Sequence, residues 1–124
     1  LWALEHSLGG EIFVPKIPSY RLSDVVKAIA PNQNMRLIGV RPGEKLHEEM
    51  ITAADSQTTY DIGKYYAIMP ANSNIYSGVG IGNSSAKKVK ENFAYNSGTN
   101  ENFLDVDEIR KLIRENIDNN FKPV

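Results

Sequence analysis

The residues best suited to chemistry begin at Arg41, which directly follows a run of apolar residues that predicts a buried strand. Pro42 and Gly43 then favour a turn, and Glu44 would stand at the start of a short helix. A guanidinium group makes paired hydrogen bonds to phosphate oxygens, and ligands gather at the carboxyl ends of strands in α/β folds. The pattern therefore indicates a phosphate-binding turn, with a solvent-exposed turn arginine as the alternative.

Other motifs with catalytic or metal-binding potential lack the surroundings that such chemistry needs. The glycine cluster Gly78–Gly82 has neither a buried strand before it nor a helix after it, so we interpret it as a flexible loop and not as a dinucleotide-binding turn. His6 and His47 lie far apart, and neither belongs to a cluster at metal spacing. No serine occupies a nucleophile elbow, and the chain has no cysteine. We therefore expect no catalytic residue and no metal site in this chain.

Composition restricts the partners of the chain. Its 124 residues include 14 Lys and Arg against 15 Asp and Glu, which gives no broad attraction to nucleic acid or to an anionic membrane. No apolar run approaches the roughly 20 residues that cross a bilayer. The lack of cysteine fits a reducing cytosol. We expect a cytoplasmic protein with no nucleic-acid partner and no membrane contact in this portion.

Apolar residues recur at helical spacing from the very start, at Leu1, Trp2, Leu4 and Leu8, as in a chain cut from a longer one. A chain of this length, with 41% hydrophobic residues, can form one small domain with a thin core. Loss of a partner domain would leave an apolar patch exposed. We therefore expect a single domain over residues 1–124 and self-association into homo-oligomers.

The rest of the pattern predicts short helices and strands. The expected elements are, in order, the end of a helix over 1–8, a strand over 11–14, a helix over 24–30, a strand over 35–40 and a helix over 44–51. Gly9 and Gly10 would end the first helix, and Ser23 would cap the second. Residues 58–62 and 65–69 predict either a hairpin or one bent strand.

The last third of the chain predicts one clear helix. Residues 70–92 are rich in Asn, Ser and Gly and indicate an irregular loop. Over 105–117, Asp105 and Glu108 can form a capping box, and the polar tail 118–124 is expected to fray. Together the elements predict an α/β fold with a small mixed sheet.

Three ordered motifs resemble one known family. They are Gly9-Gly10-Glu11-Ile12-Phe13-Val14-Pro15-Lys16-Ile17-Pro18-Ser19, then Ala28-Ile29-Ala30-Pro31, and Ile38-Gly39-Val40-Arg41-Pro42-Gly43-Glu44-Lys45-Leu46-His47-Glu48-Glu49-Met50-Ile51. They look like the C-terminal third of inverting UDP-N-acetylglucosamine 4,6-dehydratases, the CapD-like polysaccharide biosynthesis proteins among the extended short-chain dehydrogenases/reductases. The resemblance implies a substrate-binding C-terminal portion whose Rossmann domain is absent from this sequence.

The resemblance also implies a function and three site residues. The family is made of bacterial lyases that convert UDP-N-acetylglucosamine into a 4-keto-6-deoxy sugar nucleotide for surface polysaccharide or flagellin glycan. Its NADP and its catalytic groups belong to the Rossmann domain, so this chain would hold no cofactor, would be inactive alone and would need that domain as its partner. Arg41 would contact the diphosphate, Glu44 the ribose hydroxyls, and Lys16 would border the nucleotide.

Several alternatives remain open at the level of sequence. UDP-N-acetylglucosamine 4-epimerases and the membrane-anchored relatives of the dehydratases share the Arg-Pro-Gly-Glu-Lys motif, and the position of His47 after Leu46 favours the soluble dehydratases. The chain could also be a stand-alone nucleotide-binding or interaction module. Residues 71–92 depart from the family pattern in their length and glycine content.

Overall fold

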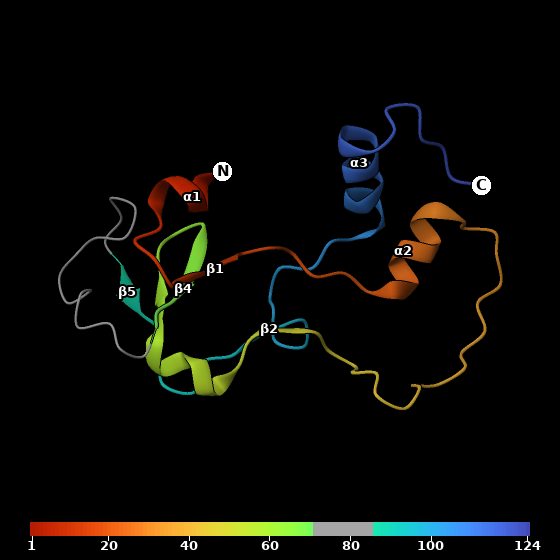
Figure 1. The fold of residues 1–124 in the computed structure, drawn as a ribbon. Coiled ribbons are helices and arrows are strands. Elements are labelled where there is room, and N and C mark those ends of the chain that lie inside the picture. The colour runs from red at the N-terminus through yellow and green to blue at the C-terminus, as the bar shows by residue number, and fades with distance from the viewer. Residues whose placement is uncertain (71–85) are drawn as a thin grey trace. The chain divides into compact units, whose positions relative to one another are not determined.

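The structure, a computed structural model, describes residues 1–70 and 86–124 (Figure 1). It forms two compact units, each built from two stretches that are far apart in the sequence. The first unit contains Leu1–Lys16 and Glu49–Asn96, and the second contains Ile17–Glu48 and Ser97–Val124. The expected α/β composition is confirmed, with two antiparallel sheets and few helices. The glycine cluster at 78–82 lies outside the described residues.

A four-stranded antiparallel sheet organises the first unit. Its strands are, in spatial order, β1 (Ile12–Pro15), β4 (Tyr65–Ile68), β3 (Thr59–Asp61) and β5 (Lys87–Lys88). β3 and β4 form a hairpin with Thr59 opposite Ile68, so the two β-favouring runs are a hairpin and not one bent strand. Gly63 lies in the connecting loop at φ +92°, a conformation that glycine adopts without steric cost. The strand predicted over 11–14 is confirmed with a shift of one residue.

Trp2 anchors the short helix α1 (Trp2–His6) to this sheet. Its ring stacks on Tyr65 with the centroids 4.6 Å apart and meets Phe13 edge-on at 5.3 Å. One buried cluster of the unit consists of Ile62, Ala67 and Met69, with Trp2, Phe13, Tyr60, Tyr65 and Ala86 packed against them. The helix predicted at the start of the chain is confirmed, but it ends at His6, before the two glycines that were expected to stop it.

Residues 49–51 form strand β2 (Glu49–Ile51), so the helix predicted over 44–51 is wrong. β2 pairs with β6 (Tyr95–Asn96) in an antiparallel two-stranded sheet, and Ile51 is fully buried there. The partner strand is distant in sequence, which is why no local pattern indicated it. A 3-10 helix, η1 (Ala53–Thr58), follows and begins with a capping box between Thr52 and Asp55.

The second unit contains two packed helices, α2 (Leu22–Ile29) and α3 (Val106–Asn116). Arg110 joins them: its Nε donates to the Ala28 carbonyl at 3.1 Å and its Nη2 donates to the Lys27 carbonyl at 3.2 Å. These carbonyls end α2 and have no partner within the helix, so the guanidinium satisfies them.

The two helices begin differently. At α3, Asp105 Oδ1 accepts the Glu108 N–H at 2.8 Å and Glu108 Oε2 accepts the Asp105 N–H at 2.9 Å, which confirms the predicted capping box. At α2, the N-cap is Arg21 and no side chain caps the helix, so the predicted Ser23 cap is wrong. The helix starts at Leu22, which places Ser23 inside the first turn instead of before it.

The chain beyond α3 forms neither helix nor strand. Its last residue, Val124, donates its N–H to the Ile29 carbonyl at 2.9 Å. Fraying of the tail stays a prediction.

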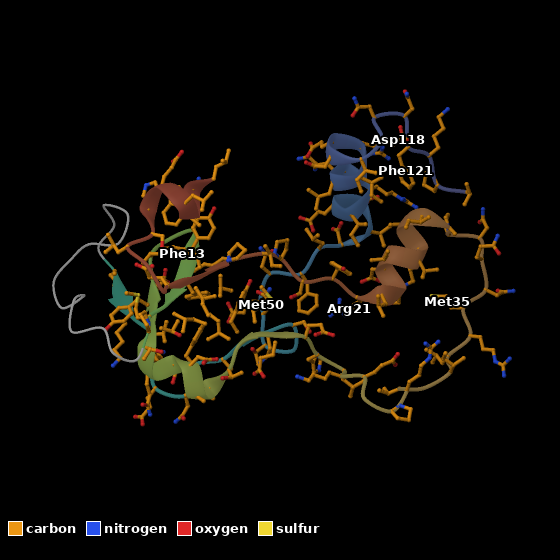
Figure 2. The ribbon with its side chains drawn as sticks, in the orientation of Figure 1. Phe13, Arg21, Met35, Met50, Asp118 and Phe121 are labelled. Atoms are coloured by element: carbon orange, nitrogen blue, oxygen red, sulfur yellow. The ribbon has the colours of Figure 1, made fainter. Side chains whose placement is uncertain are left out.

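The strand predicted over 35–40 is also wrong. Figure 2 shows Met35 on the stretch that follows α2, and the apolar side chains of this stretch are exposed, Leu37 to 97% and Ile38 to 70%. A strand needs a neighbour for its N–H and C=O groups, and no described residue pairs with this stretch. The apolar residues of this stretch predicted a buried strand, but no described part of the chain covers them.

Candidate functional site

Residues 41–44 form a tight turn and not the start of a helix. Pro42 and Gly43 occupy its central positions, and Gly43 has φ +86°, as a type II turn requires. Glu44 N–H donates to the Arg41 carbonyl at 3.0 Å, and Arg41 N–H donates to Glu44 Oε2, also at 3.0 Å. The two hydrogen bonds hold Arg41 and Glu44 next to each other.

The side chains of Arg41 and Glu44 are open to solvent. Arg41 Nε lies 3.9 Å from Glu44 Oε1, and the two side chains are 71% and 52% exposed. An ion pair of this length and exposure is weak, because water screens both charges. A phosphate group, with several oxygens, can therefore replace the carboxylate as the partner of the guanidinium.

Lys16 lies in the first unit, and its ammonium group already has partners there. Nζ lies 2.7 Å from Asp61 Oδ1 and 4.5 Å from the centroid of the Tyr66 ring. Partial burial opposes ionisation of Asp61, but hydrogen bonds from Lys16 and from the Gly63 N–H outweigh it and lower the pKa of the carboxyl. Burial raises the pKa of the Tyr66 phenol. The contacts give Lys16 a structural role at the end of β1.

The structure brings together two of the three predicted site residues, Arg41 and Glu44, whereas Lys16 belongs to the other unit. The partners of Lys16, Asp61 and Tyr66, were not found from the sequence. Strand register is the signal that could have shown them, because Asp61 stands opposite Tyr66 in the β3–β4 pair.

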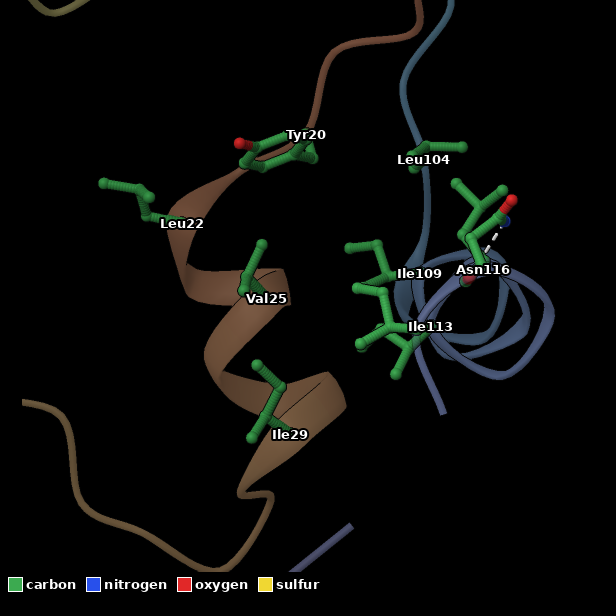
Figure 3. A pocket seen from close by; sticks show the side chains of 10 residues that line it. Tyr20, Leu22, Val25, Ile29, Leu104, Ile109, Ile113 and Asn116 are labelled. Carbon is green, nitrogen blue, oxygen red and sulfur yellow. Dashed lines mark hydrogen bonds between the residues drawn. The ribbon is translucent and has the colours of Figure 1, made fainter. Parts of the chain in front are cut away.

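An apolar hollow of about 520 Å³ lies between α2 and α3 in the second unit (Figure 3). Its lining residues are Tyr20, Leu22, Val25, Ile29, Leu104, Ile109, Leu112, Ile113, Asn116 and Ile117. The Asn116 amide donates to the Leu112 carbonyl at 3.0 Å, so it is used within its own helix. Among the described residues no charged side chain lines this hollow, and it therefore offers no charged partner for a phosphate.

Two further observations concern the described residues only. They contain no group of three or more His, Cys, Asp or Glu side chains that could hold a metal ion. In the same part of the chain, no helix is long and apolar enough to cross a membrane.

The sequence matches the family described as "Polysaccharide biosynthesis protein" over residues 1–70, and the chain belongs to this family. This match includes β1, α2 and the turn of Arg41 and Glu44. Family membership thus covers both segments that carry the predicted site residues.

Relatives with named activities extend the match toward the C-terminus. The "UDP-N-acetylglucosamine 4,6-dehydratase (inverting)" of Campylobacter jejuni is 42% identical over 114 residues, which are 88% of this chain and 34% of that protein. The "UDP-glucose 4-epimerase" of Rickettsia felis is 31% identical over 118 residues, which are 91% of this chain and 34% of that protein. The chain spans about a third of the length of these relatives.

A solved structure shares the fold. The protein Pen from Bacillus thuringiensis superposes with a TM-score of 0.69 at 27% sequence identity, over 91% of this chain and 33% of that one. The arrangement seen here is therefore also found within a larger protein.

Proposed function

We propose that this chain is the substrate-side, C-terminal part of a UDP-N-acetylglucosamine 4,6-dehydratase (inverting), and that it binds the UDP portion of the substrate. The observation that carries the proposal is the closed turn that holds Arg41 next to Glu44 with both side chains open to solvent. The 42% identity with the Campylobacter dehydratase supports the choice of substrate.

The turn offers one partner for each polar part of the nucleotide. The guanidinium group of Arg41 is cationic, and its planar fork suits the oxygens of a diphosphate. Glu44 Oε2 is already used by the Arg41 N–H, which leaves Oε1 to accept hydrogen bonds from ribose hydroxyls. When the diphosphate takes over the guanidinium, the 3.9 Å ion pair between Arg41 Nε and Glu44 Oε1 is released, and Oε1 can accept hydrogen bonds from the ribose.

Lys16 contributes in a different way in this proposal. Its ammonium group is held by Asp61 and by the Tyr66 ring, so it fixes the start of the loop that follows β1. In this proposal the loop borders the nucleotide, and Lys16 acts only by holding the point at which the loop begins.

The reaction would also need NADP, which accepts a hydride from the sugar and later returns it. A dinucleotide site requires a glycine-rich turn between a strand and a helix, and the described residues contain none. We therefore assign no cofactor to them. In this proposal the NADP and the catalytic groups belong to a Rossmann domain that acts as the partner of this chain.

The experiment that tests the function is product analysis with the full-length protein. Incubation with UDP-N-acetylglucosamine and NADP should give a 4-keto-6-deoxy product that is lighter than the substrate by one water. The 124-residue chain alone should give none. A full-length protein that leaves the substrate unchanged under these conditions would contradict the proposal.

A 4-epimerase is the second candidate, because several relatives are named UDP-glucose 4-epimerases, among them that of Rickettsia felis. An epimerase product has the mass of the substrate and differs only at C4, so mass spectrometry separates the two activities in the same experiment. Binding of UDP without any turnover of the full-length protein would instead identify a stand-alone binding module.

A further inference from the structure

A second hollow in the second unit, of about 410 Å³, combines polar and apolar side chains. Its polar lining comes from Tyr20, Arg21, His47 and Ser97, and the Phe103 ring with two leucines supplies the apolar part. The stretch that carries His47 directly follows the turn of Arg41 and Glu44. The hollow therefore belongs to the same unit as the proposed nucleotide-binding turn, and one of its lining segments continues from that turn.

Every polar side chain of this hollow can donate a hydrogen bond, and among the described residues no carboxylate lines it. Ser97 Oγ accepts the Glu48 N–H at 3.0 Å, which leaves the hydroxyl proton to be donated in another direction. A wall in which every polar side chain can donate and none is anionic suits a ligand that is rich in acceptors, and a phosphate group is such a ligand.

Arg21 adds positive charge and a fixed orientation. Its guanidinium carbon lies 4.9 Å from the centroid of the Phe103 ring, so the ring supports one face of the group. Its Nη1 lies 3.8 Å from Asp24 Oδ2, but the same carboxylate also lies 3.6 Å from Lys27 Nζ. One carboxylate is thus shared by two cations, and this group of three side chains keeps an excess of positive charge.

His47 is held in place by a glycine. A Cβ atom at Gly98 would lie 2.9 Å from two carbons of the His47 ring, which is closer than such atoms can approach. The ring therefore packs directly against the Gly98 backbone, and this contact fixes the imidazole at the wall of the hollow.

We propose that this hollow binds a phosphate group of the nucleotide ligand, with Arg21 as the charge partner and with His47 and Ser97 as hydrogen-bond donors. The inference rests on the proposed function, which supplies a diphosphate ligand, and it adds a second cation to Arg41. The Phe103 ring and the leucines then contact the less polar part of the ligand.

Calorimetric titration of the full-length protein with UDP tests the proposal. Arg21→Gln should weaken binding about 10-fold, the effect of one charge-assisted hydrogen bond. The UDP affinity of Arg21→Lys should lie between those of the wild type and of Arg21→Gln, because lysine keeps the charge and loses the planar fork.

Arg114→Gln is the control: it removes a guanidinium from α3, outside the lining of this hollow, and should leave the affinity unchanged. His47→Phe, which keeps a ring against Gly98 and removes its donors, should weaken binding several-fold even if an Arg21 variant fails to fold.

The outcomes separate this inference from the proposed function. If Arg41→Ala weakens binding while the Arg21 and His47 variants bind like the wild type, the nucleotide-binding turn stands and the hollow is excluded. If the wild type does not bind UDP, the proposed function fails, and titration with inorganic pyrophosphate decides the hollow alone. If the wild type binds pyrophosphate and Arg21→Gln does not, the phosphate site in the hollow is supported. If the wild type does not bind pyrophosphate, the proposed site is excluded.

Discussion

Lys16 Nζ and Asp61 Oδ1 lie 2.7 Å apart and join the residue after β1 to the last residue of β3, across the intervening strand β4. The ammonium group also lies over the ring of Tyr66, which belongs to β4. The Lys16 side chain, just after β1, thus contacts one residue of β4 and one residue of β3. A residue predicted to border the nucleotide therefore has a structural role that the sequence did not show.

Asp61→Asn should reduce stability at neutral pH and leave it unchanged in acid. The folded state lowers the pKa of Asp61, so its stabilisation is complete above the unfolded-state pKa of about 4 and is lost as the pH falls through the lower folded-state value. Urea unfolding of both proteins at pH 7 and at about pH 2 should show a difference only at pH 7.

Glu101→Gln is the control for this experiment, because its carboxylate is exposed and belongs to the other unit. An Asp61→Asn effect of equal size at both pH values would mean that the ion pair with Lys16 is not its cause.

Substitutions at Glu44 should separate the turn from the ligand contact. Glu44→Ala removes both the acceptor of the Arg41 N–H and the proposed ribose contact, so UDP affinity should fall about 10-fold. Glu44→Gln keeps an oxygen for the turn and loses only the charge, which should lower the UDP affinity a few-fold. Titration calorimetry of the full-length protein measures both, with Glu115→Gln on α3 as the control. Equal affinities of the Ala and Gln variants would show that the turn hydrogen bond does not matter for binding.

Truncation to alanine should reduce stability strongly at Ile51 and hardly at all at Leu37. Ile51 is 0% exposed and Leu37 is 97% exposed. Ile51→Ala should lower the free energy of unfolding by about 2–5 kcal/mol, the usual cost of a buried cavity, and Leu37→Ala should change it by less than about 0.5 kcal/mol. Denaturant titration of the 124-residue chain provides the values. A large loss in Leu37→Ala would show that residues 35–40 are buried in solution.

Gly98→Ala should displace the His47 ring without disturbing the other histidine. The added methyl would lie 2.9 Å from the imidazole, whereas His6 belongs to the other unit. NMR spectra of the ring protons should therefore show a shift for His47 and none for His6. The same variant should also weaken UDP binding, and unchanged His47 signals would contradict the packing described here.

Residue types and spacing predicted best the elements whose hydrogen bonds form within a few residues. The capping box of α3 joins Asp105 to Glu108, and the turn of Arg41 and Glu44 is closed by its own backbone and by the Glu44 carboxylate. The β3–β4 hairpin has the same local character, although the sequence left a bent strand possible. In each case the partner lies within the same short window of residues, so residue types and spacing could indicate it, although they decided neither the hairpin nor the structure that follows Glu44.

Features whose partners lie far along the chain became visible only in the folded structure. β2 is a strand because β6 pairs with it, and Lys16 is held by Asp61 in a different strand. Residues 35–40 are as apolar as a buried strand, yet they stay exposed because no described segment pairs with them. The hollow around Arg21 and His47 likewise joins segments from both ends of its unit. A backbone group is satisfied by whichever partner the fold brings to it, and that choice depends on distant residues that no local pattern contains.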